Sequence, residues 1–157
     1  MTWRGTTDTK DRILAALVYL LPILAVLDFG IYLFRQFPVL IQILSPLSPL
    51  IAIYNYPFAG IIIFFVLFLA VVRNEKVAHF IRFNTMQAIL IDVLIFLVGF
   101  LVQIISPALG QSFLMETLYN VVFLGAIASC IYSMTQSILG RYAEIPTISE
   151  AAYSQVR

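Results

Sequence analysis

Residues 73–92 read RNEKVAHFIRFNTMQAILID, and this stretch decides how the rest of the chain is interpreted. It opens with charged and amide residues and holds the only histidine, His79. It then runs without glycine or proline into an apolar segment that carries Asp92. This pattern is typical of one long helix whose first turns lie outside a membrane and whose remainder lies inside it. We therefore expect a helix over 74–105, capped by Asn74, whose membrane span begins at about residue 86.

The composition of the whole chain makes lipid the expected solvent. Of the 157 residues, 62% are hydrophobic and 11% are charged. Soluble domains are about half apolar and about a quarter charged. A compact domain of this length cannot hide so much apolar surface from water. The sequence therefore predicts an all-α integral membrane protein with a single membrane domain over residues 1–157.

Four apolar runs are long enough to cross a membrane as helices. They cover residues 13–34, 53–72, 86–105 and 118–139. At about 1.5 Å per residue, each can cross a hydrocarbon core of about 30 Å, where helices satisfy the backbone internally. We expect a four-transmembrane-helix bundle with polar tails at 1–12 and 140–157, and a kink at Pro22.

Lysine and arginine residues indicate the orientation of these spans, because they are enriched on the inner side of a membrane. With four spans and both termini inside, the outer side carries only Arg35 of the nine Lys and Arg residues. The inner eight are Arg4, Lys10, Arg12, Arg73, Lys76, Arg82, Arg141 and Arg157. We therefore expect both termini on the cytoplasmic or stromal side.

The connection between the first two spans, residues 35–52, is too apolar for a solvated loop. Its sequence, RQFPVLIQILSPLSPLIA, predicts a short helix over Val39–Leu44 that the prolines of residues 45–49 end. Two readings of this segment stay open: it lies in the outer interface, or it is partly re-entrant.

Polar side chains inside the spans are expected to face protein or water. On the third helix, Thr85, Asp92 and Gly99 repeat every seven residues, so Asp92 lies on a small or polar stripe. A stripe on the fourth helix repeats every four residues, and we interpret it as a packing surface, with a polar conduit as the alternative. It consists of Gly125, Ser129, Ser133 and Ser137.

The acid of the first helix, Asp28, has a separate interpretation. It precedes Arg35 by seven residues, which puts both on one helix face, and we expect a structural ion pair between them. The expected depths place Asp28 and Asp92 near opposite faces of the membrane.

No enzyme chemistry is expected. The single histidine and the single cysteine, Cys130, cannot form a catalytic set or a four-ligand zinc site. Neither a glycine-rich phosphate loop nor a zinc-protease motif is present, and we expect no cofactor. We identify no signal or transit peptide in the first residues, which favours a bacterial or organelle-encoded protein.

Four stretches, in order along the chain, resemble the Tic-twenty family. This family comprises the multi-pass, channel-associated subunit of the chloroplast inner-envelope protein translocon and its cyanobacterial relatives. The stretches are residues 6–22 (TTDTKDRILAALVYLLP), 64–74 (FFVLFLAVVRN), 82–92 (RFNTMQAILID) and 145–152 (IPTISEAA). The resemblance implies four helices with both ends on the stromal or cytoplasmic side, a role in moving preproteins within a larger assembly, and no catalytic residues.

The expected function is that of a non-enzymatic subunit of a protein translocation or membrane-protein biogenesis complex. The expected place is a cyanobacterial plasma membrane or a plastid inner envelope membrane. Membrane lipids, other subunits and translocating polypeptides are the expected partners, nucleic acid is not, and a homo-oligomer is an alternative.

Four residues are expected to form an inner-side polar entrance that holds helix packing and contacts a partner or a passing chain. They are Arg82, Asn84, Gln87 and Asp92. The rival function is a small homo-oligomeric ion or solute channel or transporter that uses Asp28 and Asp92. A lipid-organising structural protein is a third interpretation.

Overall fold

A computed structural model describes residues 7–156, and within that range every regular element is helical. The bundle helices are α1 (Thr9–Leu17), α2 (Leu20–Val26), α7 (His79–Leu109) and α8 (Phe113–Ile138). The shorter elements are η1 (Leu27–Gly30), α3 (Ile31–Gln36), α4 (Val39–Leu44), η2 (Ser45–Leu47), α5 (Ser48–Tyr54), α6 (Ala59–Leu67), η3 (Phe68–Val72) and α9 (Ile148–Gln155). Arg4 and Arg157 of the charge count, and the outermost parts of both expected tails, lie outside the described residues.

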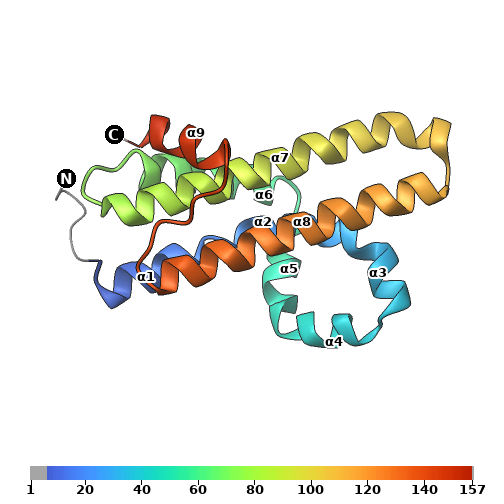
Figure 1. The fold of residues 1–157 in the computed structure, drawn as a ribbon, viewed down its shortest axis with the longest axis horizontal. Coiled ribbons are helices and arrows are strands. Elements are labelled where there is room, and N and C mark those ends of the chain that lie inside the picture. Colours follow the sequence, from blue (N-terminus) through green and yellow to red (C-terminus); the bar gives the residue numbers. More distant parts are fainter. Residues whose placement is uncertain (1–6, 157) are drawn as a thin grey trace.

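Three lines of helix run side by side and form the bundle (Figure 1). α1 and α2 lead away from one end, α7 runs in the same direction, and α8 returns antiparallel to both. α3, α4 and α5 form an arc that projects from the side of the bundle. α6 and η3 then lead back to the end where α7 begins, and α9 packs against α7 there. The start of α1 and the end of α9 therefore lie at the same end of the bundle.

The first expected helix, 13–34, is not continuous. α1 begins earlier, at Thr9, with Asp8 as its N-cap, and a turn at Val18 separates α1 from α2. Pro22 explains the break one turn before it, because its ring lacks an N–H and clashes with the carbonyl four residues back, that of Val18. A second irregularity follows at η1, a 3₁₀ turn.

The second expected helix, 53–72, is wrong as a single element. α5 ends at Tyr54 and α6 begins at Ala59, and the helices on either side of this break are bent by 92°. Pro57 removes a backbone donor, and Phe58 takes up a left-handed conformation with φ 65°, so the helix cannot continue through this point. Three helical segments in the described range are long and apolar enough to cross a membrane: Thr9–Gln36, His79–Leu109 and Phe113–Ile138. A fourth is present if the bent pair Val39–Tyr54 and Ala59–Val72 is one span.

The third helix is shifted relative to the expected 74–105. Asn74 does not cap it, because the Asn74 Oδ1 accepts from the backbone N–H of Lys76 at 3.0 Å, and α7 begins only at His79. At its other end α7 continues through Pro107 to Leu109. The carbonyl of Gln103, which Pro107 cannot bond, accepts from Ser106 Oγ at 3.3 Å, and this replaces the missing backbone donor.

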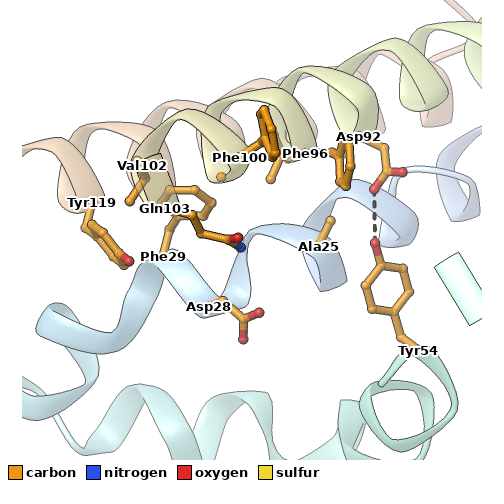
Figure 2. A pocket seen from close by; sticks show the side chains of 12 residues that line it. Ala25, Asp28, Phe29, Tyr54, Asp92, Phe96, Phe100, Val102, Gln103 and Tyr119 are labelled. Atoms are coloured by element: carbon orange, nitrogen blue, oxygen red, sulfur yellow. Dashed lines mark hydrogen bonds between the residues drawn. The ribbon is translucent and has the colours of Figure 1, made fainter. Parts of the chain in front are cut away.

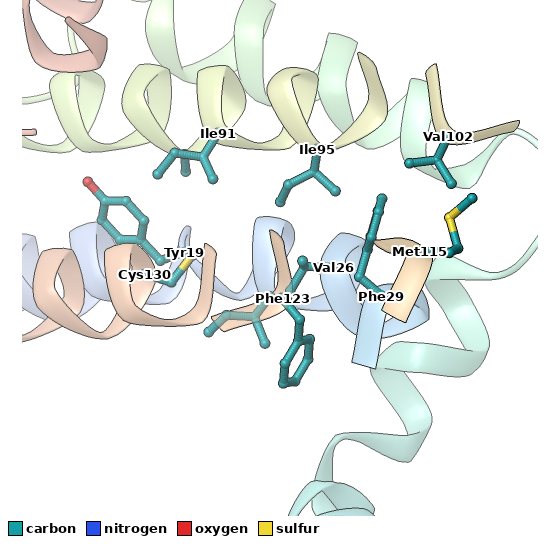
Figure 3. Packing of buried hydrophobic residues seen from close by; sticks show 11 residues of the cluster. Tyr19, Val26, Phe29, Ile91, Ile95, Val102, Met115, Phe123 and Cys130 are labelled. Atoms are coloured by element: carbon teal, nitrogen blue, oxygen red, sulfur yellow. The ribbon is translucent and has the colours of Figure 1, made fainter. Parts of the chain in front are cut away.

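The fourth helix, expected over 118–139, begins at Phe113, where Ser112 caps it through a 3.4 Å bond from the Met115 N–H. The arc contains the expected short helix, because α4 covers Val39–Leu44. The apolar core lies between α7 on one side and α2, η1 and α8 on the other (Figure 3). There Ile91, Ile95 and Val102 of α7 face Tyr19, Val26, Phe29, Met115 and Cys130.

The end of the chain, expected as a polar tail over 140–157, is an ordered part of the fold in its described portion. α9 buries Ala152, and Val156 beyond it is buried against the same part of α7. Phe83 of α7 packs against Tyr153, with ring centroids 4.4 Å apart. These contacts cover the start of α7, where the sequence predicted an inner-side polar entrance.

Candidate functional site

A closed network of buried polar side chains joins four parts of the bundle near its α9 end; we call it the polar core cluster. Its members are Tyr19, Asn84, Gln87, Ser133, Ser137 and Ser149, all buried. The chain brings them from the turn after α1, from α7, from α8 and from α9. Hydrocarbon offers no hydrogen bonds, so such groups persist in a membrane protein only when they satisfy one another.

Asn84 and Gln87, on successive turns of α7, make the central contacts. Tyr19 Oη and Ser137 Oγ each donate to Asn84 Oδ1 at 2.9 Å, and Asn84 Nδ2 donates to the carbonyl of Phe80 at 2.8 Å. Gln87 Nε2 donates to Tyr19 Oη at 3.1 Å. Gln87 Oε1 accepts from Ser149 Oγ at 2.8 Å. Both amides are therefore bonded at both ends within the chain.

This burial corrects the expected polar entrance. Asn84 and Gln87 are 0% exposed, so in this conformation neither has surface for a partner or a passing chain. Arg82 is 8% exposed, and its Nε donates to the carbonyl of Val72 at 2.9 Å, at the end of η3. The sequence could not show that α9 and α8 cover this part of α7. For these three residues the geometry supports the packing part of the hypothesis.

The small-residue stripe of α8 divides into two halves. Ser133 and Ser137 face α7 and are fully buried. Gly125 is exposed, and a Cβ added there would meet no atom within 4 Å. Ser129 Oγ donates back to the Gly125 carbonyl at 2.8 Å, and both residues line a shallow hollow of about 180 Å³. The structure therefore shows close packing for the half of the stripe near α9.

A second group of polar residues lines a cavity of about 460 Å³ between α2, η1, α5 and α7; we call it the acidic cavity (Figure 2). It extends along α7 from Asp92 to Gln103, a distance of about 16 Å at 1.5 Å per residue. Its polar walls come from Asp28, Tyr54, Asp92, Gln103 and Tyr119. Its apolar walls come from Ala25, Phe29, Ile95, Phe96, Gly99, Phe100 and Val102.

Asp92 is largely buried at one end of this cavity, with 9% of its surface exposed. Tyr54, at the end of α5, donates its hydroxyl to Asp92 Oδ1 at 3.3 Å (Figure 2). Asp28, on η1, is exposed and lines the same cavity. The two acids, expected near opposite faces of the membrane, therefore line one recess. α2, η1 and α7 run in the same direction, and the cavity extends along several turns of α7.

The expected ion pair between Asp28 and Arg35 is not formed. Both line a lateral hollow of about 580 Å³, but no carboxylate of the described residues lies within 4.0 Å of Arg35. The 3₁₀ turn of η1 rises by about 2.0 Å per residue instead of about 1.5 Å, which lengthens the separation of Asp28 and Arg35 along the helix axis.

The acidic cavity can accept hydrogen-bond donors and cations inside the apolar part of the bundle. Asp92 and Asp28 supply carboxylates, and Gln103 supplies an amide. In the part of the chain that the structure describes, no group of three or more His, Cys, Asp or Glu residues could hold a metal ion. The arrangement is that of a recess that binds polar groups.

Sequence reasoning missed Tyr19, Tyr54 and Ser149. A signal existed for the tyrosines, because a buried tyrosine hydroxyl usually finds a hydrogen-bond partner. Which partner each finds depends on contacts between residues far apart in the chain. Ser149 carried no such signal, since it lies in the segment expected to be a polar tail.

Comparison with known protein families gives a match over residues 8–152 to the family described as "Chloroplast import apparatus Tic20-like". A "Tic20 family protein" from Synechocystis sp. is 55% identical over 159 residues, covering 100% of this chain and 99% of its own length. "Protein TIC 20-II, chloroplastic" from Arabidopsis thaliana is 33% identical, covering 96% of this chain and 74% of its own. "Tic20 family protein Ycf60" from Porphyra purpurea is 34% identical, covering 97% and 80%. All three similarities extend along nearly the whole chain.

Proposed function

The chain belongs to the Tic20 family, and from this premise we propose that it is a non-enzymatic membrane subunit of a complex that translocates or inserts polypeptides. The family description names a chloroplast import apparatus, and the similarity covers the helices that build both the polar core cluster and the acidic cavity. We propose that residues 1–157 form a single membrane domain.

The acidic cavity is the observation that carries this proposal beyond family membership. An acid near the centre of a membrane helix costs about 3 kcal/mol, so it is kept where it faces protein or water and has a task there. Here Asp28, Asp92 and Gln103 line one recess between the spans. A recess of about 460 Å³ with acceptor groups offers donors of a polypeptide a polar surface at membrane depth.

The proposed topology has four spans, with both termini on the cytoplasmic or stromal side. It takes the bent pair Val39–Tyr54 and Ala59–Val72 as the second crossing. The arrangement of the bundle supports it, because the start of α1 and the end of α9 lie at one end. The proposed membrane is the cyanobacterial plasma membrane, or the inner envelope membrane if the gene is plastid-encoded.

Other subunits and polypeptides in transit are the proposed partners. Of the four residues expected to contact them, Asp92 lines the acidic cavity, and we place that contact there. Arg82, Asn84 and Gln87 act through packing, because they hold α7 against η3, α8 and α9.

Photocrosslinking in the native membrane tests the proposal. A photoreactive phenylalanine replaces Gln103, which lines the cavity and is exposed, and adducts are identified by mass spectrometry. We expect adducts with membrane-complex subunits and with polypeptides in transit. The matched control carries the same probe at Leu124 of α8, which is 55% exposed and lines no part of the cavity; it should give few such adducts.

The rival channel or transporter gives a different result. Adducts at Gln103 that contain only further copies of this chain, together with purification as a homo-oligomer, would contradict the translocation proposal. In that case ion flux through the reconstituted protein would fall on Asp92→Asn, which removes a carboxylate from the cavity.

A further inference from the structure

A second groove, away from the acidic cavity, lies between α1, the end of α6 with η3, and the start of α7. Its volume is about 600 Å³. The floor is apolar and consists of Leu14, Leu17, Val18, Leu21, Leu67 and Val71. Three charged residues, Lys10, Asp11 and Lys76, line the groove at the end where α1 and α7 begin.

The spacing along α1 and α2 explains this division. Lys10, Leu14, Leu17 and Leu21 follow one another at three- and four-residue steps, so the lysine and the leucines lie on one face. Lys76 reaches the same groove from the segment before α7. The groove therefore has a cationic mouth where α1 and α7 begin, which is the inner end of the bundle in the proposed topology. Beyond this mouth the groove continues over its apolar floor.

Both lysines are exposed, and in residues 7–156 neither has a carboxylate within 4.0 Å. The mouth carries a net charge of +1, since Asp11 offsets one of the two lysines. Leu14 is 41% exposed and Leu17 is 49% exposed, so the floor is open to whatever surrounds the bundle. A free phosphate would match the mouth but would leave the floor uncovered.

We propose that this groove binds an anionic glycerophospholipid, with its phosphate between Lys10 and Lys76 and an acyl chain along the leucine floor. The two halves of such a lipid match the two halves of the groove in charge and polarity. Basic pockets between helices on the inner side of a membrane recognise anionic headgroups in this way, and long lysine side chains reach the headgroup level.

The hollow beside Arg35 provides an internal comparison. It is also lateral, also apolar in part, and similar in volume at about 580 Å³, but Asp28 and Arg35 leave it without net charge. The same reasoning predicts no headgroup preference there. Arg35→Gln is therefore a matched control for removal of a lysine from the groove.

Native mass spectrometry of the full chain in detergent measures the binding. Phosphatidylglycerol and phosphatidylcholine with identical acyl chains are the two probes. We expect phosphatidylglycerol to bind the wild-type chain at least about five-fold more tightly, because each cation near the surface contributes about a factor of five to anionic lipid binding. Lys10→Gln with Lys76→Gln should remove that preference, whereas Arg35→Gln should keep it.

Two further measurements separate lipid from phosphate binding and guard against a misfolded variant. Leu14→Trp fills the floor without changing charge and should weaken both lipids. Glycerol phosphate, a headgroup without acyl chains, should not displace phosphatidylglycerol at millimolar concentration. An equal affinity for the two lipids, an unchanged preference in the double lysine variant, or full displacement by glycerol phosphate would each overturn the proposal.

Discussion

Two asparagines in the bundle show that the same type of side chain stabilises this fold at one position and destabilises it at another. Asn84 has its oxygen and its nitrogen bonded, to Tyr19, Ser137 and the carbonyl of Phe80. Asn120 of α8 has a buried side-chain oxygen without a hydrogen-bond partner among the described residues. A buried polar atom costs free energy when it lacks a partner, so the same residue type has opposite effects at these two positions.

We predict that Asn84→Leu lowers the free energy of unfolding by about 2 kcal/mol, because Tyr19 Oη loses its acceptor inside the bundle. Equilibrium unfolding of the full chain in mixed micelles measures this. Asn120→Leu is the control and should be neutral or stabilising, since no bond is lost. Equal losses in both variants would show that the polar core cluster does not hold the helices together.

Among the elements, the end of α8 depends on a conformation that only glycine adopts without strain. Gly140 has φ 72°, its N–H donates to the Ser137 carbonyl at 2.9 Å, and the Arg141 N–H donates to the Gln136 carbonyl at 2.9 Å. These two bonds form a Schellman motif, which satisfies the last carbonyls of the helix. The motif turns the chain back over α7, so the position of α9 depends on the conformation of this glycine.

Gly140→Ala should destabilise the protein by about 1 kcal/mol or more, because a side chain is disfavoured at positive φ. The added Cβ would also approach Arg12 Nε and Thr7 Oγ1 to 2.8 Å. Gly125→Ala tests the effect of the methyl group alone: it lies within α8 with no neighbour inside 4 Å, and we expect no loss of stability. Thermal unfolding followed by circular dichroism compares the two. A loss at Gly125 that matches the loss at Gly140 would contradict this explanation.

For the whole molecule, the bend between α5 and α6 determines how the chain crosses the membrane. Nine residues of α6 and five of η3 are too short to span about 30 Å at 1.5 Å per residue, so a fourth crossing needs the arc as well. The arc exposes apolar side chains, among them Ile41 at 57% and Ile43 at 66%. These side chains suit contact with lipid whether the arc lies in the interface or enters the membrane.

Cysteine labelling tests this topology. In a Cys130→Ala background, a membrane-impermeant maleimide added outside intact cells should modify Gln111→Cys, in the exposed loop between α7 and α8. It should modify Ser154→Cys, exposed on α9, only after permeabilisation. Labelling of Ser154→Cys from outside would exclude inner termini. In the same background, modification of Gln42→Cys on α4 indicates an interfacial arc, and protection indicates a re-entrant one.

The sequence by itself determined the features that depend on neighbouring residues and on overall polarity. Its apolar composition identified the class of protein and the helical fold, because hydrocarbon cannot satisfy an open backbone. The prolines of residues 45–49 limited the helix at Val39–Leu44, and Pro22 predicted a kink in the first helix, where the structure has a full break one turn earlier. Four stretches along the chain, residues 82–92 among them, indicated the family, which the comparison over residues 8–152 confirms.

Only the tertiary structure decided where the polar residues of that same stretch point. Their polarity predicts that Asn84, Gln87 and Asp92 avoid lipid, but it does not show what covers them. α9 returns from the far end of the sequence and bonds to Gln87, and α5 brings Tyr54 to Asp92. Both contacts join residues far apart in the chain, and their geometry follows from the left-handed turn at Gly140 and the bend after Tyr54. Local sequence could therefore predict that these polar residues face away from lipid, whereas their division between a sealed core and a cavity depends on long-range packing.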